Sequence, residues 1–254
     1  MQMNQSKDWQ GQMLGRYQMI RMLGRGGMGE VWLAEDTQLR RQVAVKLLPL
    51  VLASDKDYLQ AFEAEARTAA SLDYPHILPV HDFGDVPLAN GEIVTYLIMP
   101  YIDGGTLRDL MRSSGQLVPL EKSMRYLRQA AQAIDFAHSQ RVLHRDIKPA
   151  NMLLQQDWLF LTDFGIAKLL TTATNRSQTH SGAGTPEYMA PEQIQGKAEA
   201  ASDLYSLAMT AYQLFTGTVP FKGETPYEVL IKHMQETPTS PRQLNPTIPL
   251  TVDT

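Results

Sequence analysis

The N-terminal part of the chain alternates between short apolar segments and turn residues, a pattern typical of β-strands. Strands are predicted at residues 17–23, 42–48, 77–85 and 93–99. The last two are joined through Asn90-Gly91, a frequent hairpin turn. Residues 55–72 differ, because their apolar side chains recur every three to four positions, as on a helix. This part is therefore predicted to be a β-sheet with one helix.

The rest of the chain consists mainly of longer segments with a helical period. Thr106 and Asp109 have the spacing of a capping box that opens a short helix. Residues 120–140 are predicted to form a long amphipathic helix. Its apolar stripe comprises Met124, Leu127, Ala131, Ile134 and Ala137. Two further helices are predicted, one at residues 202–215 before Gly217 and one that follows Thr225 and runs to about residue 236.

A Pro/Gly-rich connector, residues 100–105, separates these two parts. The part before it is predicted to be mostly strand and the part after it mostly helix. We therefore expect an α+β protein with two lobes that meet at this connector.

Composition excludes several classes of protein. With 43% hydrophobic and 20% charged residues among 254, the chain resembles an ordinary globular protein. No apolar run approaches the roughly 18 residues of a membrane span, and residues 1–10 lack the apolar core of a secretory signal. A net charge of −4 argues against a nucleic-acid partner. The absence of cysteine fits a reducing compartment, so we expect a cytoplasmic protein without a membrane segment.

A glycine-rich stretch, Gly24-Arg25-Gly26-Gly27-Met28-Gly29, lies between two predicted strands. In a dinucleotide-binding fold such a motif opens a helix, but here β-favouring residues follow it. The order strand, glycine loop, strand indicates a hairpin flap whose backbone N–H groups can cover phosphates. A simple turn is the alternative, and four glycines among six residues disfavour it.

Lys46 lies inside the apolar strand predicted at residues 42–48. Because a lysine is almost never buried without a partner, it needs an anion, either phosphate or a glutamate. Glu65 borders the apolar face of the helix predicted at residues 55–72, whereas Glu63 is expected to face water. Glu65 is therefore the candidate partner.

Residues 144–165 carry three polar groups suited to a metal and its substrate, Asp146, Asn151 and Asp163. The apolar runs 152–154 and 158–161 predict a tight hairpin that would bring Asn151 and Asp163 side by side. Carboxylate and amide oxygens suit Mg²⁺, which keeps phosphate oxygens as further ligands. The stretch therefore predicts a magnesium site next to a free aspartate.

Six motifs follow one another along the chain. They are Gly24-x-Gly26-x-x-Gly29-x-Val31, Val43-Ala44-Val45-Lys46, Glu65, His144-Arg145-Asp146-x-Lys148-x-x-Asn151, Asp163-Phe164-Gly165 and Ala190-Pro191-Glu192. This ordered set resembles the eukaryotic-like (Hanks-type) protein kinases, and the neighbouring residues resemble the bacterial serine/threonine kinases. The resemblance covers about residues 15–250.

The resemblance implies a two-lobed protein kinase fold of the α+β class. A polar leader is expected at residues 1–14, and a kinase domain at residues 15–254. Within it, an N-lobe with an antiparallel sheet and one helix is expected at 15–99, a hinge at 100–104 and a mainly helical C-lobe at 105–254. The implied activity is transfer of the γ-phosphate of ATP, with Mg²⁺ or in its place Mn²⁺, to Ser or Thr hydroxyls of protein substrates.

The resemblance also implies a role for each site residue. Asp146 accepts the substrate proton and Lys148 steadies the γ-phosphate. Lys46 contacts the α- and β-phosphates and pairs with Glu65. Asn151 and Asp163 hold Mg²⁺. Further nucleotide contacts are implied for Leu23, Gly24, Arg25, Gly26, Gly27, Met28, Gly29, Val31, Ala44, Met99, Pro100, Ile102, Asp103 and Leu154.

Regulation is implied by Arg145, which resembles the arginine that receives an activation-loop phosphate. Residues 171–184 are rich in Ser and Thr, and we favour Thr179 and then Ser177 as phosphosites. Autophosphorylation in trans would require a transient homodimer. The alternative is a polar loop without a regulatory role. Thr185, close to the substrate platform, is expected to be structural.

The sequence departs from the family pattern in two places. The turn at residues 155–157 has no glycine, and no arginine follows Arg242 that could pair with Glu192, so we expect the last C-lobe helices to be missing. One alternative function is therefore a truncated, catalytically impaired kinase-like binding module, which the complete set of catalytic residues disfavours. A small-molecule phosphotransferase is the other alternative, and the loop ending in Ala190-Pro191-Glu192 disfavours it.

Overall fold

The computed structural model describes residues 8–26, 29–48, 56–88, 91–113, 115, 117–164 and 185–250, without the side chains of residues 56–62 and 65. The chain divides into two compact units. Unit 1 comprises Met1–Ala70 and Pro79–Tyr101, and unit 2 comprises Ser71–Leu78 and Ile102–Thr254. The division after Tyr101 falls within the hinge expected at residues 100–104.

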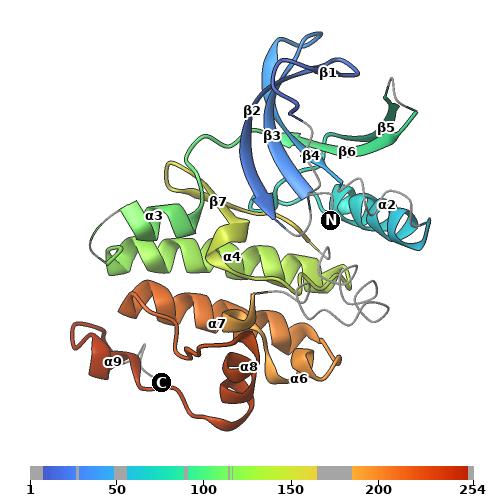
Figure 1. Ribbon diagram of the computed structural model, residues 1–254. Coiled ribbons are helices and arrows are strands. Elements are labelled where there is room, and N and C mark those ends of the chain that lie inside the picture. The colour runs from blue at the N-terminus through green and yellow to red at the C-terminus, as the bar shows by residue number, and fades with distance from the viewer. Residues whose placement is uncertain are drawn as a thin grey trace. The chain divides into compact units, whose positions relative to one another are not determined.

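Unit 1 is built on a six-stranded antiparallel sheet with the strand order β1-β2-β3-β4-β6-β5 (Figure 1). One helix, α2, follows β4 in the described part of this unit. The elements are β1 (Met13–Leu14), β2 (Tyr17–Gly26), β3 (Gly29–Asp36), β4 (Arg41–Leu47), α2 (Lys56–Ser71), β5 (Asp82–Pro87) and β6 (Ile93–Pro100). The predicted sheet with one helix is confirmed.

The core of unit 1 covers one face of this sheet. Successive side chains of a strand point to opposite faces, so Val43 and Val45 of β4 share a face, on which Trp32 of β3 also lies. Trp9 and Leu14 pack into the same cluster, with exposed fractions of 4% and 0%. Residues 8–14 were expected to belong to a polar leader. In the structure their apolar side chains Trp9 and Leu14 pack into the core of unit 1.

The strand predicted at residues 77–85 is placed differently in the structure. Strand β5 begins only at Asp82, while Ile77 makes an isolated bridge to Leu161 and belongs to the core of unit 2. Pro79 lies between these two positions and has no N–H to donate to a ladder. The predicted strand is thus divided between the core of unit 2, which takes Ile77, and strand β5 of unit 1.

Unit 2 is mainly helical, as predicted. Its helices are α3 (Leu107–Ser113), α4 (Leu120–Ser139), α6 (Pro191–Ile194), α7 (Ala200–Thr216), α8 (Pro226–Gln235) and α9 (Pro241–Leu244), with 3-10 turns at Pro149–Asn151 and Pro186–Tyr188. A hairpin of β7 (Met152–Gln155) and β8 (Trp158–Leu161) adds the only sheet in the described part of this unit. In the described ranges, no helix is long and apolar enough to span a bilayer.

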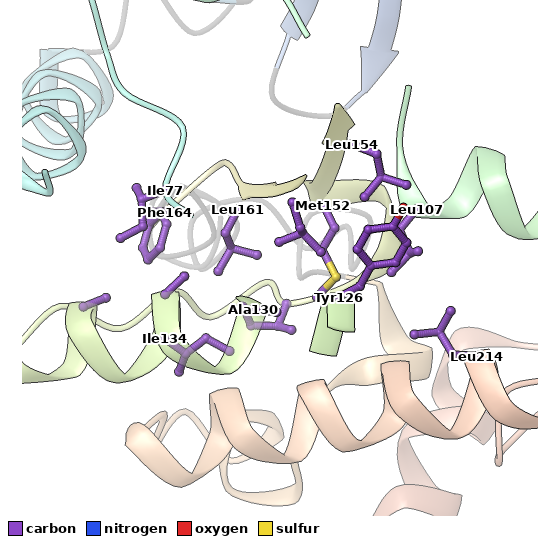
Figure 2. Packing of buried hydrophobic residues seen from close by; sticks show 14 of the residues in the cluster. Ile77, Leu107, Tyr126, Ala130, Ile134, Met152, Leu154, Leu161, Phe164 and Leu214 are labelled. Carbon is purple, nitrogen blue, oxygen red and sulfur yellow. The ribbon is translucent and has the colours of Figure 1, made fainter. Parts of the chain in front are cut away.

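The core of unit 2 lies between the β7–β8 hairpin and α4. Figure 2 shows Met152 and Leu161 of the hairpin pointing toward Ala130 and Ile134 of α4, and Leu214 entering the same cluster from α7. The hairpin is the one predicted from the two apolar runs, and its turn contains Gln156 at φ 56° in place of a glycine. This packing fixes the segment that leads from Asn151 to Asp163.

The buried face of α4 is rotated from the predicted stripe. Met124 is 39% exposed, whereas Ser123 and Tyr126 are buried. The Ser123 hydroxyl donates to the Val118 carbonyl and the Tyr126 hydroxyl to the Gln156 carbonyl. Because these hydrogen bonds satisfy the polar atoms, the two side chains can be buried, which a count of hydrophobic residues does not detect.

Helix ends follow their sequence signals. The Asp109 N–H donates to the Thr106 hydroxyl, and the Asp109 carboxylate accepts from the Thr106 N–H, which confirms the capping box. The Thr225 hydroxyl caps α8 by accepting from the Glu228 N–H. Gly217 ends α7 in the left-handed region at φ 76°.

Ile134→Ala and Met124→Ala together test the position of the buried face. The first substitution leaves a cavity in the core and should lower the free energy of unfolding by about 2–5 kcal/mol. The second removes an exposed side chain and should change it by less than about 0.5 kcal/mol. Urea denaturation measures both values. Equal losses at the two positions would contradict the placement of this face.

Candidate active site

Unit 1 places its predicted nucleotide residues on the sheet face opposite the core. In the strand register Lys46 is paired with Val31, and Ala44 is paired with Met99. Directly paired residues share a face, and so do residues two apart on one strand. These four side chains therefore lie on one face, while Val45 between them points into the core.

Lys46 is 3% exposed on this face. Burial of an ammonium group is unfavourable without anionic or hydrogen-bonding groups around it. Helix α2 is present where the partner helix was predicted. The side chain of Glu65 lies outside the described part of the structure, so its pairing with Lys46 stays a prediction.

The glycine-rich stretch forms the hairpin end of β2 and β3, as predicted. Gly24 is paired with Val31 and Gly26 with Gly29, and the register shifts between Met22 and Gly24. The Arg25 guanidinium and the Glu30 carboxylate form an ion pair of 2.6 Å across the two strands. Leu23 is 37% exposed. Gly27 and Met28, at the tip, lie outside the described residues.

The predicted hinge residues lie at the end of β6 and just beyond it. Pro100 ends β6 and is paired with Val43, so Pro100 takes a ladder position at which its missing N–H is tolerated. Ile102 and Asp103 then begin the second segment of unit 2. They lead directly into two glycines whose role the sequence did not reveal.

Gly104 and Gly105 pack directly against Leu154 of β7. A Cβ atom added at Gly104 would lie 2.1 Å from the Leu154 carbonyl oxygen, far inside van der Waals contact. The Leu154 N–H donates to the Gly105 carbonyl at 2.9 Å. This backbone contact fixes the position of Asp103 relative to Leu154. Asp103 is the predicted ribose contact and Leu154 the predicted adenine contact of unit 2.

Asp146 lies in a network of charged and amide groups. Its carboxylate is paired with the Lys148 ammonium at 2.7 Å and accepts from the Asn151 amide at 2.9 Å. The same amide donates to the Asp146 carbonyl at 2.8 Å. Asp146 and Asn151 are 7% and 6% exposed. The structure thus brings three predicted residues together and holds the Asp146 carboxylate in one orientation.

Lys148 makes a second contact that the sequence did not predict. Its ammonium donates to the Thr185 hydroxyl at 2.9 Å. Thr185 immediately follows the undescribed residues 165–184 and precedes the 3-10 turn Pro186–Tyr188. The segment predicted to be catalytic and the start of the predicted substrate platform are therefore linked through this lysine.

The predicted metal residues lie at the open end of the β7–β8 hairpin. The Thr162 N–H donates to the Asn151 carbonyl at 3.0 Å, so Asn151 stands opposite the residue before Asp163. Asp163 has φ 67°, a left-handed conformation that is rare for residues other than glycine. The hairpin predicted from the sequence therefore brings these two residues into the same region.

These residues fit a hard divalent cation. The Asn151 NH₂ group is engaged with Asp146, which leaves its amide oxygen available as a ligand. With the Asp163 carboxylate it supplies the oxygen donors that Mg²⁺ prefers, and Mg²⁺ usually takes only one or two carboxylates plus phosphate oxygens. Over the described ranges no cluster of three His, Asp or Glu side chains could hold a metal ion by itself.

Asp203, in the first turn of α7, was not among the predicted site residues, yet it fixes the catalytic backbone. Its carboxylate accepts from the His144 N–H at 2.8 Å and from the Arg145 N–H at 2.7 Å. Arg145 has φ 66°, and its carbonyl accepts from the Gln193 amide at 2.7 Å. The only signal in the sequence was that Asp203 is the single charged residue of the helix predicted at residues 202–215.

His144 is buried and holds Asp146 from the other side. Its Nδ1 accepts from the Asp146 N–H at 3.2 Å, and its Nε2 donates to the Thr162 carbonyl at 2.9 Å. This pattern requires the neutral ring, and burial lowers the pKa of His144 accordingly. The centroid of the His144 ring also lies 4.6 Å from the centroid of the Phe164 ring. His144 therefore connects the segments that carry Asp146 and Asp163.

Glu192 accepts a hydrogen bond of 2.5 Å from the Ser202 hydroxyl. No ion pair involves Glu192 within the described part of the chain. The predicted phosphosites Thr179 and Ser177 lie outside the described residues. Arg145 is the predicted phosphate receptor. Its Nε atom is buried and has no hydrogen-bond partner among the residues that the structure describes.

Residues 17–251 match the family model of the protein kinase domain. The chain belongs to the protein kinase family. This confirms the family and the fold that the six motifs predicted.

Among relatives of this kinase domain, serine/threonine-protein kinase PknB of Mycobacterium leprae is 39% identical over 240 residues, which are 94% of this chain and 38% of the relative. PrkC of Bacillus subtilis, also named a serine/threonine-protein kinase, is 38% identical over 94% of this chain and 36% of its own length. The chain thus spans little more than a third of these proteins. The PknI kinase domain of Mycobacterium tuberculosis has a TM-score of 0.69 and 31% identity, covering 93% of this chain and 83% of that structure.

Gly104→Ala tests the contact between the hinge glycines and β7. The added methyl group cannot remain 2.1 Å from the Leu154 oxygen, so the backbone must shift. We expect a loss of about 1–3 kcal/mol in unfolding free energy, as for other overpacked sites. We also expect faster hydrogen exchange at the Leu154 amide, because the backbone shift in this variant would strain its hydrogen bond to the Gly105 carbonyl.

Gly196→Ala is the control, because a Cβ there meets nothing within 4 Å although φ is +78°. It should cost stability through backbone conformation alone and leave the Leu154 amide protected. Unchanged exchange at Leu154 in the Gly104→Ala variant would contradict the contact.

Proposed function

We propose that this chain is the catalytic domain of an ATP-dependent protein serine/threonine kinase. The observation that carries the proposal is the Asp146 carboxylate, held by Lys148 and Asn151 beside the backbone that leads to Asp163. A carboxylate fixed in this way can align an incoming hydroxyl. Membership of the protein kinase family supports the same reaction.

The reaction assigned to these residues is in-line transfer of the ATP γ-phosphoryl group to a Ser or Thr hydroxyl. Asp146 accepts the hydroxyl proton and orients its oxygen toward phosphorus. Lys148, 2.7 Å from Asp146, is placed to offset charge on the transferred phosphoryl oxygens. Mg²⁺, or Mn²⁺ in its place, would be held by Asn151 and Asp163 and would neutralise phosphate charge.

Unit 1 would supply most of the contacts to ATP. Lys46 binds the α- and β-phosphates, with Glu65 as its partner, while the glycine hairpin covers the phosphates. Ala44 and Leu154 would enclose the adenine, with Met99 as the gatekeeper. The backbones of Pro100 and Ile102 would face the base, and Asp103 the ribose.

The domain boundaries that accompany this proposal are an N-lobe at residues 15–99, a hinge at 100–104 and a C-lobe at 105–254. The protein would act in the cytoplasm on protein substrates that carry Ser or Thr. It would autophosphorylate Thr179, and then Ser177, through a transient homodimer. Arg145 is the proposed receptor of that phosphate, because within the described ranges its buried Nε atom has no hydrogen-bond partner.

Asp146→Asn should lower the rate of phosphoryl transfer roughly 10²- to 10⁴-fold, because an amide cannot accept the substrate proton. Transfer of radiolabelled phosphate from Mg-ATP to a generic basic protein measures this rate. Asp157→Asn is the matched control, since Asp157 is an exposed carboxylate of the same unit that pairs with Arg125 at 2.5 Å. It should retain the wild-type rate.

Equal background labelling by wild type and Asp146→Asn would exclude the kinase proposal. A loss of labelling in the Asp157→Asn control as large as in Asp146→Asn would show that the assay reports stability and not chemistry.

Thr179→Ala and Ser177→Ala test the proposed regulation. After incubation of the wild type with Mg-ATP, phosphopeptide mapping should find phosphate first at Thr179 and then at Ser177, and each substitution should remove its own site. The wild type should also label the inactive Asp146→Asn chain, as transfer in trans requires. An unmodified loop after this incubation would contradict the proposal, and Thr174→Ala serves as the control within the same loop.

A further inference from the structure

His233 of α8 is a polar side chain next to an apolar cluster. It is 5% exposed, and its ring packs edge-on against that of Phe221, with 4.8 Å between the ring centroids. Phe221 forms the cluster with Met209 of α7 and Val229 of α8. An apolar side chain would fill the same space without the cost of burying polar atoms, so the imidazole is expected to bind groups that an apolar residue cannot.

One ring nitrogen is bound from α7. The Tyr205 hydroxyl lies 2.7 Å from His233 Nδ1. Burial raises the pKa of Tyr205 to about 12, so this hydroxyl keeps its proton at neutral pH and can donate it. Burial also lowers the pKa of His233, so the ring is neutral and carries a single proton.

The other ring nitrogen faces the 3-10 turn Pro186–Tyr188, which packs against α8. His233 Nε2 is buried and has no hydrogen-bond partner within the described part of the chain. The carbonyl groups of Pro186 and Glu187 nevertheless lie close enough to favour the charged ring and to oppose the effect of burial on its pKa. Because carbonyl groups only accept hydrogen bonds, the single proton belongs on Nε2, and Nδ1 accepts from Tyr205.

This turn is the start of the predicted substrate platform. It directly follows Thr185, whose hydroxyl accepts from the Lys148 ammonium at 2.9 Å. Helix α7 holds the last residue of the turn, since the Ser206 hydroxyl donates to the Tyr188 carbonyl at 2.7 Å. His233 faces the first two residues of the turn from the side of α8.

We propose that His233 is a positioning residue for the protein substrate. Its ring, fixed by the Tyr205 hydroxyl, presents an N–H group to the Pro186 and Glu187 carbonyls and so holds the start of the substrate platform against α8. His233 is not a catalytic residue, because within the described ranges its polar contacts are with Tyr205 and with this turn. The inference rests on the proposed kinase activity for its kinetic readout but not for its spectroscopic one.

The kinetic test compares His233→Leu, which fills the space without a polar atom, with His233→Gln, which can accept from Tyr205 and donate to the turn. In His233→Leu the KM for a generic basic protein substrate should rise about fivefold or more, because the platform loses a hydrogen-bond donor that positions it. The kcat and the KM for ATP should stay within about twofold, since Lys148 and Asn151 still hold Asp146. His233→Gln should bring the raised KM most of the way back to the wild-type value.

A double variant, Tyr205→Phe with His233→Leu, separates the lost contact to the turn from an unpaired hydroxyl. His233→Leu alone deprives the Tyr205 hydroxyl of its partner and should lower the melting temperature. Removal of both polar partners should bring the melting temperature back close to that of the wild type. The KM for the protein substrate should stay raised, because the turn still lacks its donor.

Thr225→Ala is the control for a general weakening of α8. It removes the hydroxyl that caps this helix by accepting from the Glu228 N–H. Thermal unfolding should show a loss of stability, as in His233→Leu, while the KM for the protein substrate stays near the wild-type value.

Two-bond ¹⁵N–¹H correlation spectra of the imidazole rings give a readout that does not depend on activity. The His233 signals are those that disappear in His233→Gln. At neutral pH they should show a neutral ring with its proton on Nε2. In Tyr205→Phe the Nδ1 signal should shift, because that nitrogen loses its hydrogen-bond donor.

The inference is overturned if the ring is charged at neutral pH or carries its proton on Nδ1. It is also overturned if the wild type is active and His233→Leu keeps its KM for the protein substrate, if Gln is no better than Leu, or if Thr225→Ala raises this KM as much. A wild-type KM in the double variant would assign the effect to the unpaired hydroxyl and overturn it as well. An inactive wild type with a neutral ring protonated on Nε2 would instead refute the proposed function while supporting the contact between His233 and the turn.

Discussion

One buried carboxylate, that of Asp203, holds the backbone that precedes Asp146, the proposed catalytic residue of unit 2. It binds two consecutive N–H groups at 2.8 and 2.7 Å and so holds Arg145 in a left-handed conformation. That conformation is unfavourable for a residue with a side chain and persists only where the surroundings enforce it. The turn that results presents Asp146 to Lys148 and Asn151. Removal of one partner from such a buried network costs about 3–5 kcal/mol, a large share of a typical domain stability.

Packing extends this constraint to Asn151 and Asp163, the proposed metal ligands. The β7–β8 hairpin is anchored on α4 by Met152 and Leu161, which are fully buried. The same helix carries His138 near its end, whose Nε2 donates to the Asp203 carboxylate, so one rigid element supports both the hairpin and the Asp203 network. A site assembled on helix and hairpin can hold its groups more accurately than one on a free loop.

Sequence reasoning succeeded where a local pattern determines a local structure. The Thr106 capping box, the β7–β8 hairpin and the α7 end at Gly217 depend on residues close in the chain, and all three are confirmed. It failed where a residue acts through distant partners. Asp203 reaches residues 58 and 59 positions earlier, and Gly104 matters only because Leu154 packs against it. Neither contact leaves a periodic signal.

The rotated face of α4 shows why hydrophobic patterns mislead next to a functional site. Ser123 and Tyr126 are buried because carbonyl groups of other segments accept their hydroxyl hydrogens, so hydrogen bonding and not hydrophobicity decides which side faces inward. His144, Asp146, Asn151 and Asp203, all at most 7% exposed, are likewise buried with hydrogen-bond partners. A core that contains the polar groups proposed for phosphoryl transfer can bury them only as a connected network. Some of the polar residues that interrupt the hydrophobic pattern, such as Asp203, therefore support the proposed site.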